Sequence, residues 1–99
     1  MKYSYKTKGV CSRQINVEIE DNVIKSVEFI GGCHGNTQGV AALAVGMDVD
    51  DYISRCENIK CGYKTTSCPA QLAEALKEAS ARLVQAAYLV KENRTYYQR

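Results

Sequence analysis

The first third of the chain alternates apolar and polar side chains with a period of two, which is the pattern of half-buried strands. The pattern predicts strands over residues 3–8, 11–20 and 23–30. In the middle segment Ile15, Val17 and Ile19 share one face, and polar residues occupy the other. Because Asp21 and Asn22 separate the second and third segments, we expect a two-residue turn there and an antiparallel meander of three strands.

The periodicity changes after residue 30, where "GGCHGNTQG" holds four glycines in nine residues and is too glycine-rich for regular structure. Asn36 or Thr37 is expected to cap the next helix, and Gly46 to end it in the left-handed conformation. Asp48 is expected to begin a second short helix, because acidic residues follow it in the first turn. These two helices are predicted to run through residues 39–45 and 49–55.

The strongest helical pattern begins at Pro69, because proline is favoured at the first helical position, where its missing N–H would be unpaired anyway. Cys68 is then expected at the cap, and the helix runs to about Val90. Its apolar stripe is Leu72, Leu76, Ala79, Leu83 and Ala86/Ala87. The fold class is therefore α+β: a three-stranded antiparallel sheet, two short helices and one long C-terminal helix packed on one face.

Composition places the chain among single globular domains. It has 99 residues, 45% hydrophobic and 24% charged, with a net charge of +2, too small to indicate nucleic acid. We expect one domain over residues 1–99, with a core at about 9–90 and a frayed tail at 91–99. No segment approaches the ~20 apolar residues of a membrane span, and no hydrophobic signal region is evident. We therefore expect a cytoplasmic protein with reduced thiols.

Five cysteines are many for that compartment, and they lie at Cys11, Cys33, Cys56, Cys61 and Cys68. An odd number without a secretory signal argues against a disulfide framework and leaves metal binding or redox chemistry. At the start of a helix, the backbone amides and the dipole favour the thiolate of Cys68, the form that binds metals and attacks electrophiles. Cys56, between Arg55 and Glu57, is equally well explained as a small buried hydrophobe.

Three cysteines are expected at one end of the sheet: Cys11 at the start of a strand, Cys33 in the glycine-rich loop, and Cys68 before the long helix. Cys61 is the best fourth ligand, because a set of four thiolates holds zinc or an iron–sulfur cluster. His34 is a reserve ligand, a base that activates a neighbouring thiol, or an exposed loop residue. Structural zinc sites usually contain tight C-x(2–4)-C pairs; only Cys56 and Cys61 come close, and no second tight pair follows, so spacing alone supports the site weakly.

Two segments, "FIGGCHGNTQGVAALAVGM" and "CGYKTTSCPAQLAEAL", together resemble the TSCPD-domain family over about residues 9–80. The motif that names the family reads TSCPA at residues 66–70, so Ala70 replaces its final acidic residue. The resemblance implies a small stand-alone relative of the C-terminal domain of cobalamin-dependent ribonucleotide reductases. Ninety-nine residues leave no room for the reductase barrel or its cobalamin site, so we do not expect a complete ribonucleotide reductase.

The layout is also similar, more distantly, to the NifU/IscU iron–sulfur scaffold proteins. On that pattern Cys11, Cys33 and Cys68 fall on the three cysteines that hold the cluster. Arg13 stands where the scaffold has an aspartate, and Ser67 where it has a histidine. These differences argue against cluster assembly but leave metal binding open, and a more positive site favours thiolates.

Three functions remain open from the sequence. The first is a metal-binding module, with zinc or an iron–sulfur cluster, that serves a ribonucleotide reductase or another redox protein. The second is a metal-free thiol protein that delivers electrons to a reductase, with Cys68 as nucleophile and Cys33 or Cys61 as its resolving partner. The third is a structural interaction domain that forms a homodimer through a sheet edge. A membrane is not an expected partner, because no apolar span is present. Nucleic acid is not an expected partner either, because a solvated helix end explains the basic tail with Tyr96 and Tyr97.

Overall fold

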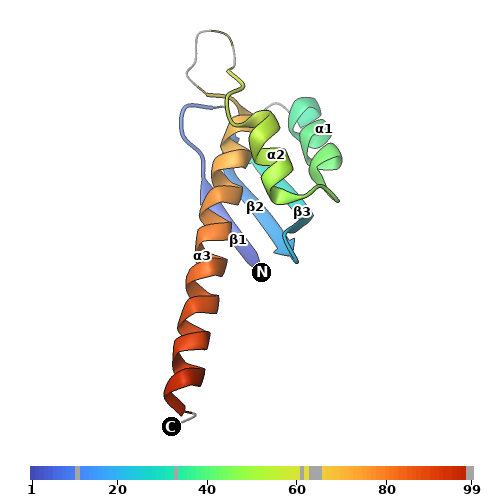
Figure 1. The fold of residues 1–99 in the computed structure, drawn as a ribbon. Coiled ribbons are helices and arrows are strands. Elements are labelled where there is room, and N and C mark those ends of the chain that lie inside the picture. The colour runs from blue at the N-terminus through green and yellow to red at the C-terminus, as the bar shows by residue number, and fades with distance from the viewer. Residues whose placement is uncertain (11, 33, 61, 63–65, 98–99) are drawn as a thin grey trace.

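The computed structural model describes residues 1–10, 12–32, 34–60, 62 and 66–97. The strands are β1 (Lys2–Lys6), β2 (Ser12–Glu20) and β3 (Val23–Gly31), and the helices are α1 (His34–Ala44), α2 (Val49–Cys56) and α3 (Cys68–Tyr97). The described strands form one antiparallel sheet in the order β1-β2-β3, and the helices lie on one side of it (Figure 1). The predicted α+β arrangement is confirmed.

The predicted hairpin turn between β2 and β3 is also confirmed. Asp21 and Asn22 have φ values of 53° and 61°, so both turn residues are left-handed, as the common two-residue hairpin turn requires. Aspartate and asparagine tolerate this conformation better than other non-glycine residues. The turn is held against α2, because the Asn22 amide donates to the carboxylates of Asp48 (2.9 Å) and Asp50 (3.1 Å).

The core lies between the sheet and the helices. Ile15, Val17 and Ile19 are buried, as the alternation predicts. The α3 stripe is buried at Leu72, Leu76 and Ala79, but Leu83 is 37% exposed, so the expected stripe is wrong at that position. The reason is visible in Figure 1, where α3 continues past the end of the sheet that covers its first half. The helix is also longer than expected, running to Tyr97 rather than ending near Val90.

The sequence predicted the start of α2 correctly but not the start of α1. The Asp48 cap of α2 is confirmed, since its carboxylate accepts a hydrogen bond from the Asp51 amide at 3.1 Å. The expected cap of α1 is wrong: α1 begins at His34, so Asn36 and Thr37 are helical residues. Gly31 and Gly32, with φ of +79° and +86°, turn the chain straight from β3 toward the helix.

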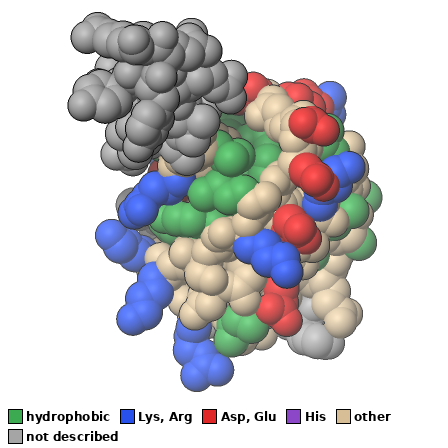
Figure 2. Space-filling view, turned by 90° about the horizontal axis from the view of Figure 1, so that it is seen from below, with side chains coloured by type: hydrophobic (Ala, Val, Ile, Leu, Met, Phe, Trp, Pro, Cys, Tyr) green, Lys and Arg blue, Asp and Glu red, His purple; other side chains and the backbone are tan. Residues whose placement is uncertain are grey.

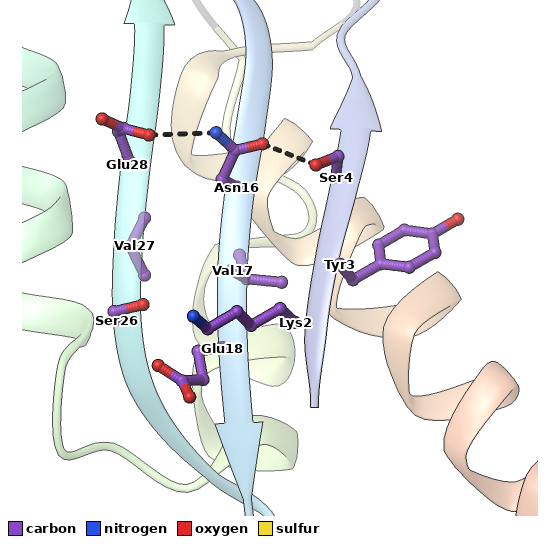
Figure 3. A pocket seen from close by; sticks show the side chains of 9 residues that line it. All are labelled: Lys2, Tyr3, Ser4, Asn16, Val17, Glu18, Ser26, Val27 and Glu28. Atoms are coloured by element: carbon purple, nitrogen blue, oxygen red, sulfur yellow. Dashed lines mark hydrogen bonds between the residues drawn. The ribbon is translucent and has the colours of Figure 1, made fainter.

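The outer side of the sheet is polar. Asn16 of β2 hydrogen-bonds with Ser4 of β1 and Glu28 of β3, at 2.8 and 2.9 Å, so one row of side chains crosses all three strands (Figure 3). Figure 2 shows the molecule from below. In this view acidic side chains form a row on one side, and most basic side chains lie on the other. Both signs therefore share this face, in keeping with the small net charge.

Candidate thiol site at the start of helix α3

The start of α3 is capped by a serine. The Ser67 hydroxyl accepts a hydrogen bond from the Ala70 amide at 3.2 Å, and the Ser67 carbonyl accepts the first helical bond, from the Gln71 amide at 2.8 Å. Ser67 is therefore the cap, and the prediction that Cys68 caps the helix is wrong by one residue. A hydroxyl oxygen is the better acceptor for a backbone amide than sulfur. Consequently the thiol of Cys68 is not used for capping.

The Cys68 thiol is half-buried and faces the first residue of β2. Its sulfur lies 3.5 Å from the hydroxyl oxygen of Ser12, which is itself buried. The end of β3 reaches the same place, because a Cβ on Gly32 would stand 2.9 Å from the backbone nitrogen of Ser12. The start of β2, the end of β3 and the start of α3 are distant in sequence but meet around Ser12. We call this region, with Ser12, Gly32 and Cys68, the thiol corner.

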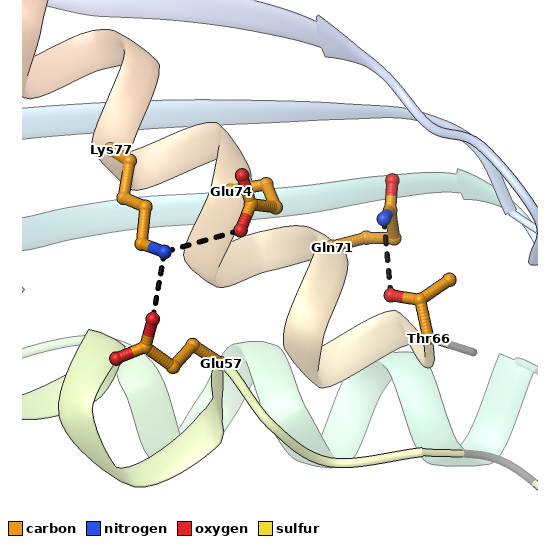
Figure 4. A network of polar contacts seen from close by, with 5 residues as sticks. All are labelled: Glu57, Thr66, Gln71, Glu74 and Lys77. Carbon is orange, nitrogen blue, oxygen red and sulfur yellow. Dashed lines mark hydrogen bonds and ion pairs between the residues drawn. The ribbon is translucent and has the colours of Figure 1, made fainter.

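A buried amide fastens the loop between β1 and β2 to this corner. The side-chain oxygen of Gln71 accepts from the backbone N–H of Lys8 at 2.9 Å, and its nitrogen donates to the hydroxyl of Thr66 at 3.1 Å (Figure 4). The Thr66 methyl group is also 3.4 Å from where a Cβ on Gly9 would lie. At the other end of the loop the Thr7 hydroxyl donates to the carbonyl of Ser12. Gln71 therefore positions the segment that precedes β2.

Helix α2 contributes Tyr52, which is only 3% exposed. Its hydroxyl donates to the carbonyl oxygen of Pro69 at 2.9 Å, so the ring reaches the first turn of α3. Burial raises the pKa of Tyr52 above its usual range, and the charge and hydrogen bonding of Cys56 and the charge of Cys68 raise it further. Sequence reasoning missed this tyrosine. The signal for it was the i,i+4 spacing of Tyr52 and Cys56, which puts both on one face of α2.

A charged contact joins the same two helices at the surface. The ammonium of Lys77 lies 2.7 Å from the carboxylate of Glu57 and 3.2 Å from that of Glu74 (Figure 4). Hydrogen bonds to Glu57 and Glu74 raise the pKa of Lys77. Because Glu57 directly follows α2, this contact holds the end of α2 against α3, close to the turn of α3 that carries Gln71.

The predicted ligands fall into two groups. Cys11, Cys33 and Cys61 lie outside the described residues, so the predictions made for them are untested. Cys68 lies in the corner just described, and His34 is the first residue of α1. Within the described ranges, no three histidine, cysteine, aspartate or glutamate side chains gather into a metal site. Cys56, for which burial was an equal explanation, is half-buried and packs against the core.

The donor chemistry of the corner fits a thiophilic ion. Its described donors are the Cys68 thiol and the Ser12 hydroxyl beside it, and thiolates are the preferred ligands of zinc and iron–sulfur clusters. Arg13 adds positive charge nearby, since its Nε lies 3.3 Å from where a Cβ on Gly31 would stand. No helix within the described part of the chain is long and apolar enough to cross a bilayer.

Comparison with known proteins gives one match. A family model described as TSCPD domain matches residues 1–80, which contain the whole sheet, α1, α2 and the first turns of α3. Neither the curated proteins nor the solved structures include a match to the chain.

Proposed function

Because the chain belongs to the TSCPD-domain family, we propose that it is a small metal-binding module that serves a ribonucleotide reductase or another redox protein. Its ligands are the thiolates of Cys11, Cys33 and Cys68, with Cys61 as the fourth and His34 in reserve. Zinc is the first choice of metal and an iron–sulfur cluster the second, since both take four thiolates. The proposal requires a reducing compartment such as the cytoplasm, where thiols remain available.

One observation carries the proposal, namely the contact of Ser12 and Gly32 beside the sulfur of Cys68. In the sequence, Cys11 directly precedes Ser12 and Cys33 directly follows Gly32. Consecutive Cα atoms are about 3.8 Å apart, so this adjacency in the sequence is the reason to assign both cysteines to the same site as Cys68. This supports a shared site for three of the four proposed thiolates.

The direct test is the metal content of protein purified without oxygen, measured by elemental analysis and visible absorbance. We expect about one zinc per chain, or the visible absorption of an iron–sulfur cluster. Metal below roughly a tenth of an equivalent after reconstitution with zinc or with iron and sulfide, together with free reaction of all thiols, would overturn the proposal.

The ligands can be identified one at a time, because trypsin places each cysteine in a different peptide. Cleavage after lysine and arginine releases residues 9–13, 26–55, 56–60, 61–64 and 65–77, which each contain a single cysteine. Alkylation of metal-loaded and metal-free protein, followed by mass spectrometry of these peptides, then measures protection at each thiol. We expect strong protection of Cys11, Cys33, Cys61 and Cys68 in the loaded protein.

A second candidate is a metal-free thiol protein, and the Ser12 hydroxyl 3.5 Å from the Cys68 sulfur favours it, since a hydroxyl stabilises a thiolate. The Cys68 thiolate would attack a partner's disulfide and break its S–S bond, so that a mixed disulfide forms and the first partner thiolate leaves and takes up a proton. Cys33 or Cys61 would then displace the second partner thiolate, which takes up a proton, leaving one protein disulfide and a reduced partner. This candidate predicts metal-free protein in which Cys68 is alkylated much faster than the other cysteines.

The third candidate, a structural interaction domain, predicts no metal and slow alkylation of all five cysteines. It also predicts a homodimer through a sheet edge, and β1 and β3 are the two edge strands among the described residues. Sedimentation at several protein concentrations tests that association separately from metal content.

A further inference from the structure

The free side of β3 is the longer of the two edges of the described sheet. β3 has nine residues and β1 has five. β1 also carries Lys2 and Lys6, the kind of residue that protects an edge strand from pairing with another chain, whereas residues 26–31 of β3 include no lysine. Among the described strands β3 lies last in the order β1-β2-β3, with α1 beside it (Figure 1). This edge is therefore the place where a further strand can join.

The hydrogen bonds of the sheet show which backbone groups of β3 face this edge. Successive residues of a strand point their N–H and C=O groups to alternate sides of the strand. Ile19 of β2 exchanges two hydrogen bonds of 2.8 Å with the first residue of the chain, so its backbone groups point toward β1. Val17 and Ile15 point the same way by this alternation. The residues opposite them in β3, Val27 and Phe29, therefore direct their N–H and C=O groups away from β2.

A second contact agrees with this assignment. Ile24, near the start of β3, also directs its backbone away from β2, because its N–H donates to the Met47 carbonyl at 2.9 Å and its C=O accepts from the Gly46 N–H at 2.8 Å. The register shift of β3 accounts for the odd spacing between this residue and Val27. Among the described residues, no hydrogen bond uses the outward groups of Val27 or Phe29. Two N–H and two C=O groups are thus left for another backbone.

A groove runs along this edge between β3 and α1, and we call it the β3–α1 groove. It has a volume of about 270 Å³, and the residues that line it are Val27, Glu28, Phe29, Thr37, Gln38 and Ala41. This volume is below the roughly 300–1,000 Å³ of ordinary small-molecule pockets, so the groove suits a few side chains of a peptide better than a whole ligand. A strand added to β3 would direct every second side chain to the side of the sheet that carries α1.

We propose that the β3–α1 groove binds an extended segment of a partner protein, which adds a fourth, antiparallel strand to the sheet. The segment has apolar side chains toward α1 and polar side chains on the outer face, where a basic residue lies beside Glu28. Glu28 is exposed on that face and accepts a hydrogen bond from Asn16 on its β2 side (Figure 3). The proposal goes beyond metal binding, because none of the groove residues is a proposed ligand, so each proposal can fail without the other.

A second copy of this chain fits the same edge less well. Two copies that paired antiparallel through β3 would be related by a twofold axis perpendicular to the sheet, which places both α1 helices on one side and next to each other. Neighbouring strands are about 4.8 Å apart, whereas packed helices need about 8–10 Å between their axes. Because α1 lies beside β3, the two helices would collide (Figure 1). An extended peptide without a helix of its own avoids this conflict.

Hydrogen exchange measured by NMR tests the edge and its occupant together. In the free chain the Val27 and Phe29 amides should exchange at least about tenfold faster than the Glu28 amide, which points to β2. A blocked octapeptide of alternating valine and lysine, at about 1 mM, should slow exchange at Val27 and Phe29 by about threefold or more. The same peptide N-methylated at its valines lacks the donors that face β3, so it should give no protection.

Two variants of the chain separate backbone pairing from general attraction of a basic peptide. Val27→Pro removes an N–H that the β2–β3 ladder does not use, so the chain should fold and the peptide should no longer protect Phe29. Glu28→Gln should weaken peptide binding by about twofold to fivefold. Glu18→Gln, on the same face but in the middle strand, is the matched control and should leave binding unchanged. The N-methylated peptide gives the backbone test without altering the chain.

Three results would overturn the proposal. The first is protection of the Val27 and Phe29 amides in the free monomer, which would mean that the edge is already covered. The second is no protection by the octapeptide, or equal protection by its N-methylated form. The third is protection that rises with protein concentration together with a dimer in sedimentation, which would make a second copy the occupant.

Discussion

The hydroxyl of Tyr52 donates a hydrogen bond of 2.9 Å to the carbonyl oxygen of Pro69, and this bond joins α2 to the first turn of α3. The first turn of α3 carries Cys68, and its cap is Ser67. The position of the candidate site therefore depends on a buried contact between two helices as well as on the strands that meet there.

Removing that hydroxyl should destabilise the fold modestly. Tyr52→Phe leaves the Pro69 carbonyl with its helical partner, so we expect a loss of about 1 kcal/mol in the free energy of unfolding, measured by urea denaturation. Tyr5→Phe is the matched control, because Tyr5 is half-buried and its hydroxyl forms no hydrogen bond with the described residues. The control should stay within about 0.5 kcal/mol of the wild-type chain.

The same tyrosine should make the fold sensitive to alkali. Its pKa is raised in the folded state, first by burial, so folding opposes ionisation. The stability that this gives is fully present below the unfolded pKa of about 10 and is lost as pH rises above it. Thermal unfolding between pH 8 and 11, in a reducing buffer, should show a steeper fall for the wild-type chain than for Tyr52→Phe. Parallel curves would contradict this assignment.

Gly32 should tolerate no side chain. Its φ is +86°, and an added Cβ would stand 2.9 Å from the backbone nitrogen of Ser12, which cannot move without disturbing β2. We expect Gly32→Ala to cost about 2 kcal/mol or more from the left-handed backbone and the clash together. Gly39→Ala is the opposite control: nothing lies within 4 Å of its Cβ position inside α1, so it should stabilise the chain by about 0.5–1 kcal/mol. Equal effects at the two glycines would refute this.

The cap of α3 should depend on one hydroxyl. Ser67→Ala removes the acceptor of the Ala70 amide and the donor to the Ile59 carbonyl, so we expect a loss of about 1–2 kcal/mol in chemical denaturation. Ser54→Ala, at an exposed position in α2, should change stability by less than about 0.5 kcal/mol. If both variants behave alike, Ser67 is not the cap.

Gln71 should hold the β1–β2 loop in place. Gln71→Leu leaves the Lys8 amide and the Thr66 hydroxyl without their partner, and we expect about 1–3 kcal/mol of destabilisation. Native-state hydrogen exchange measures the local effect. The Lys8 amide should exchange at least about tenfold faster, whereas the Ile15 amide should change only as much as the loss of global stability requires. Gln38→Leu, on the exposed side of α1, is the control. Unchanged protection of the Lys8 amide in Gln71→Leu would show that Gln71 does not hold the loop.

Much of the fold followed from local patterns. The alternation around Ile15, Val17 and Ile19 located β2, and the Asp48 cap located α2, because both signals are confined to a few neighbouring residues. Ile24 was harder to place, since it is fully buried although Val27 and Phe29 set the opposite alternation in β3. A register shift between Glu18 and Ile19 changes which residues face the core, and sequence alone does not reveal it.

The candidate site was less predictable, because its contacts join distant segments. Motif and spacing identified Cys68, but the roles of Tyr52 and Gln71 depend on how α2 and the β1–β2 loop pack against α3. The cap was misplaced by one residue because proline is favoured at the first helical position, whereas Pro69 occupies the second. The ligand predictions for Cys11, Cys33 and Cys61 stay predictions.

The length of α3 gives the thiol corner a mechanical connection to the far end of the molecule. Thirty helical residues span about 45 Å, and Cys68 and Tyr97 stand at the two ends. Any ligand that tilts the first turn of α3 by roughly 5° would swing the opposite end through about 4 Å, as a lever does. A spectroscopic label near Tyr97 would therefore report events at Cys68 from a place where it does not disturb them.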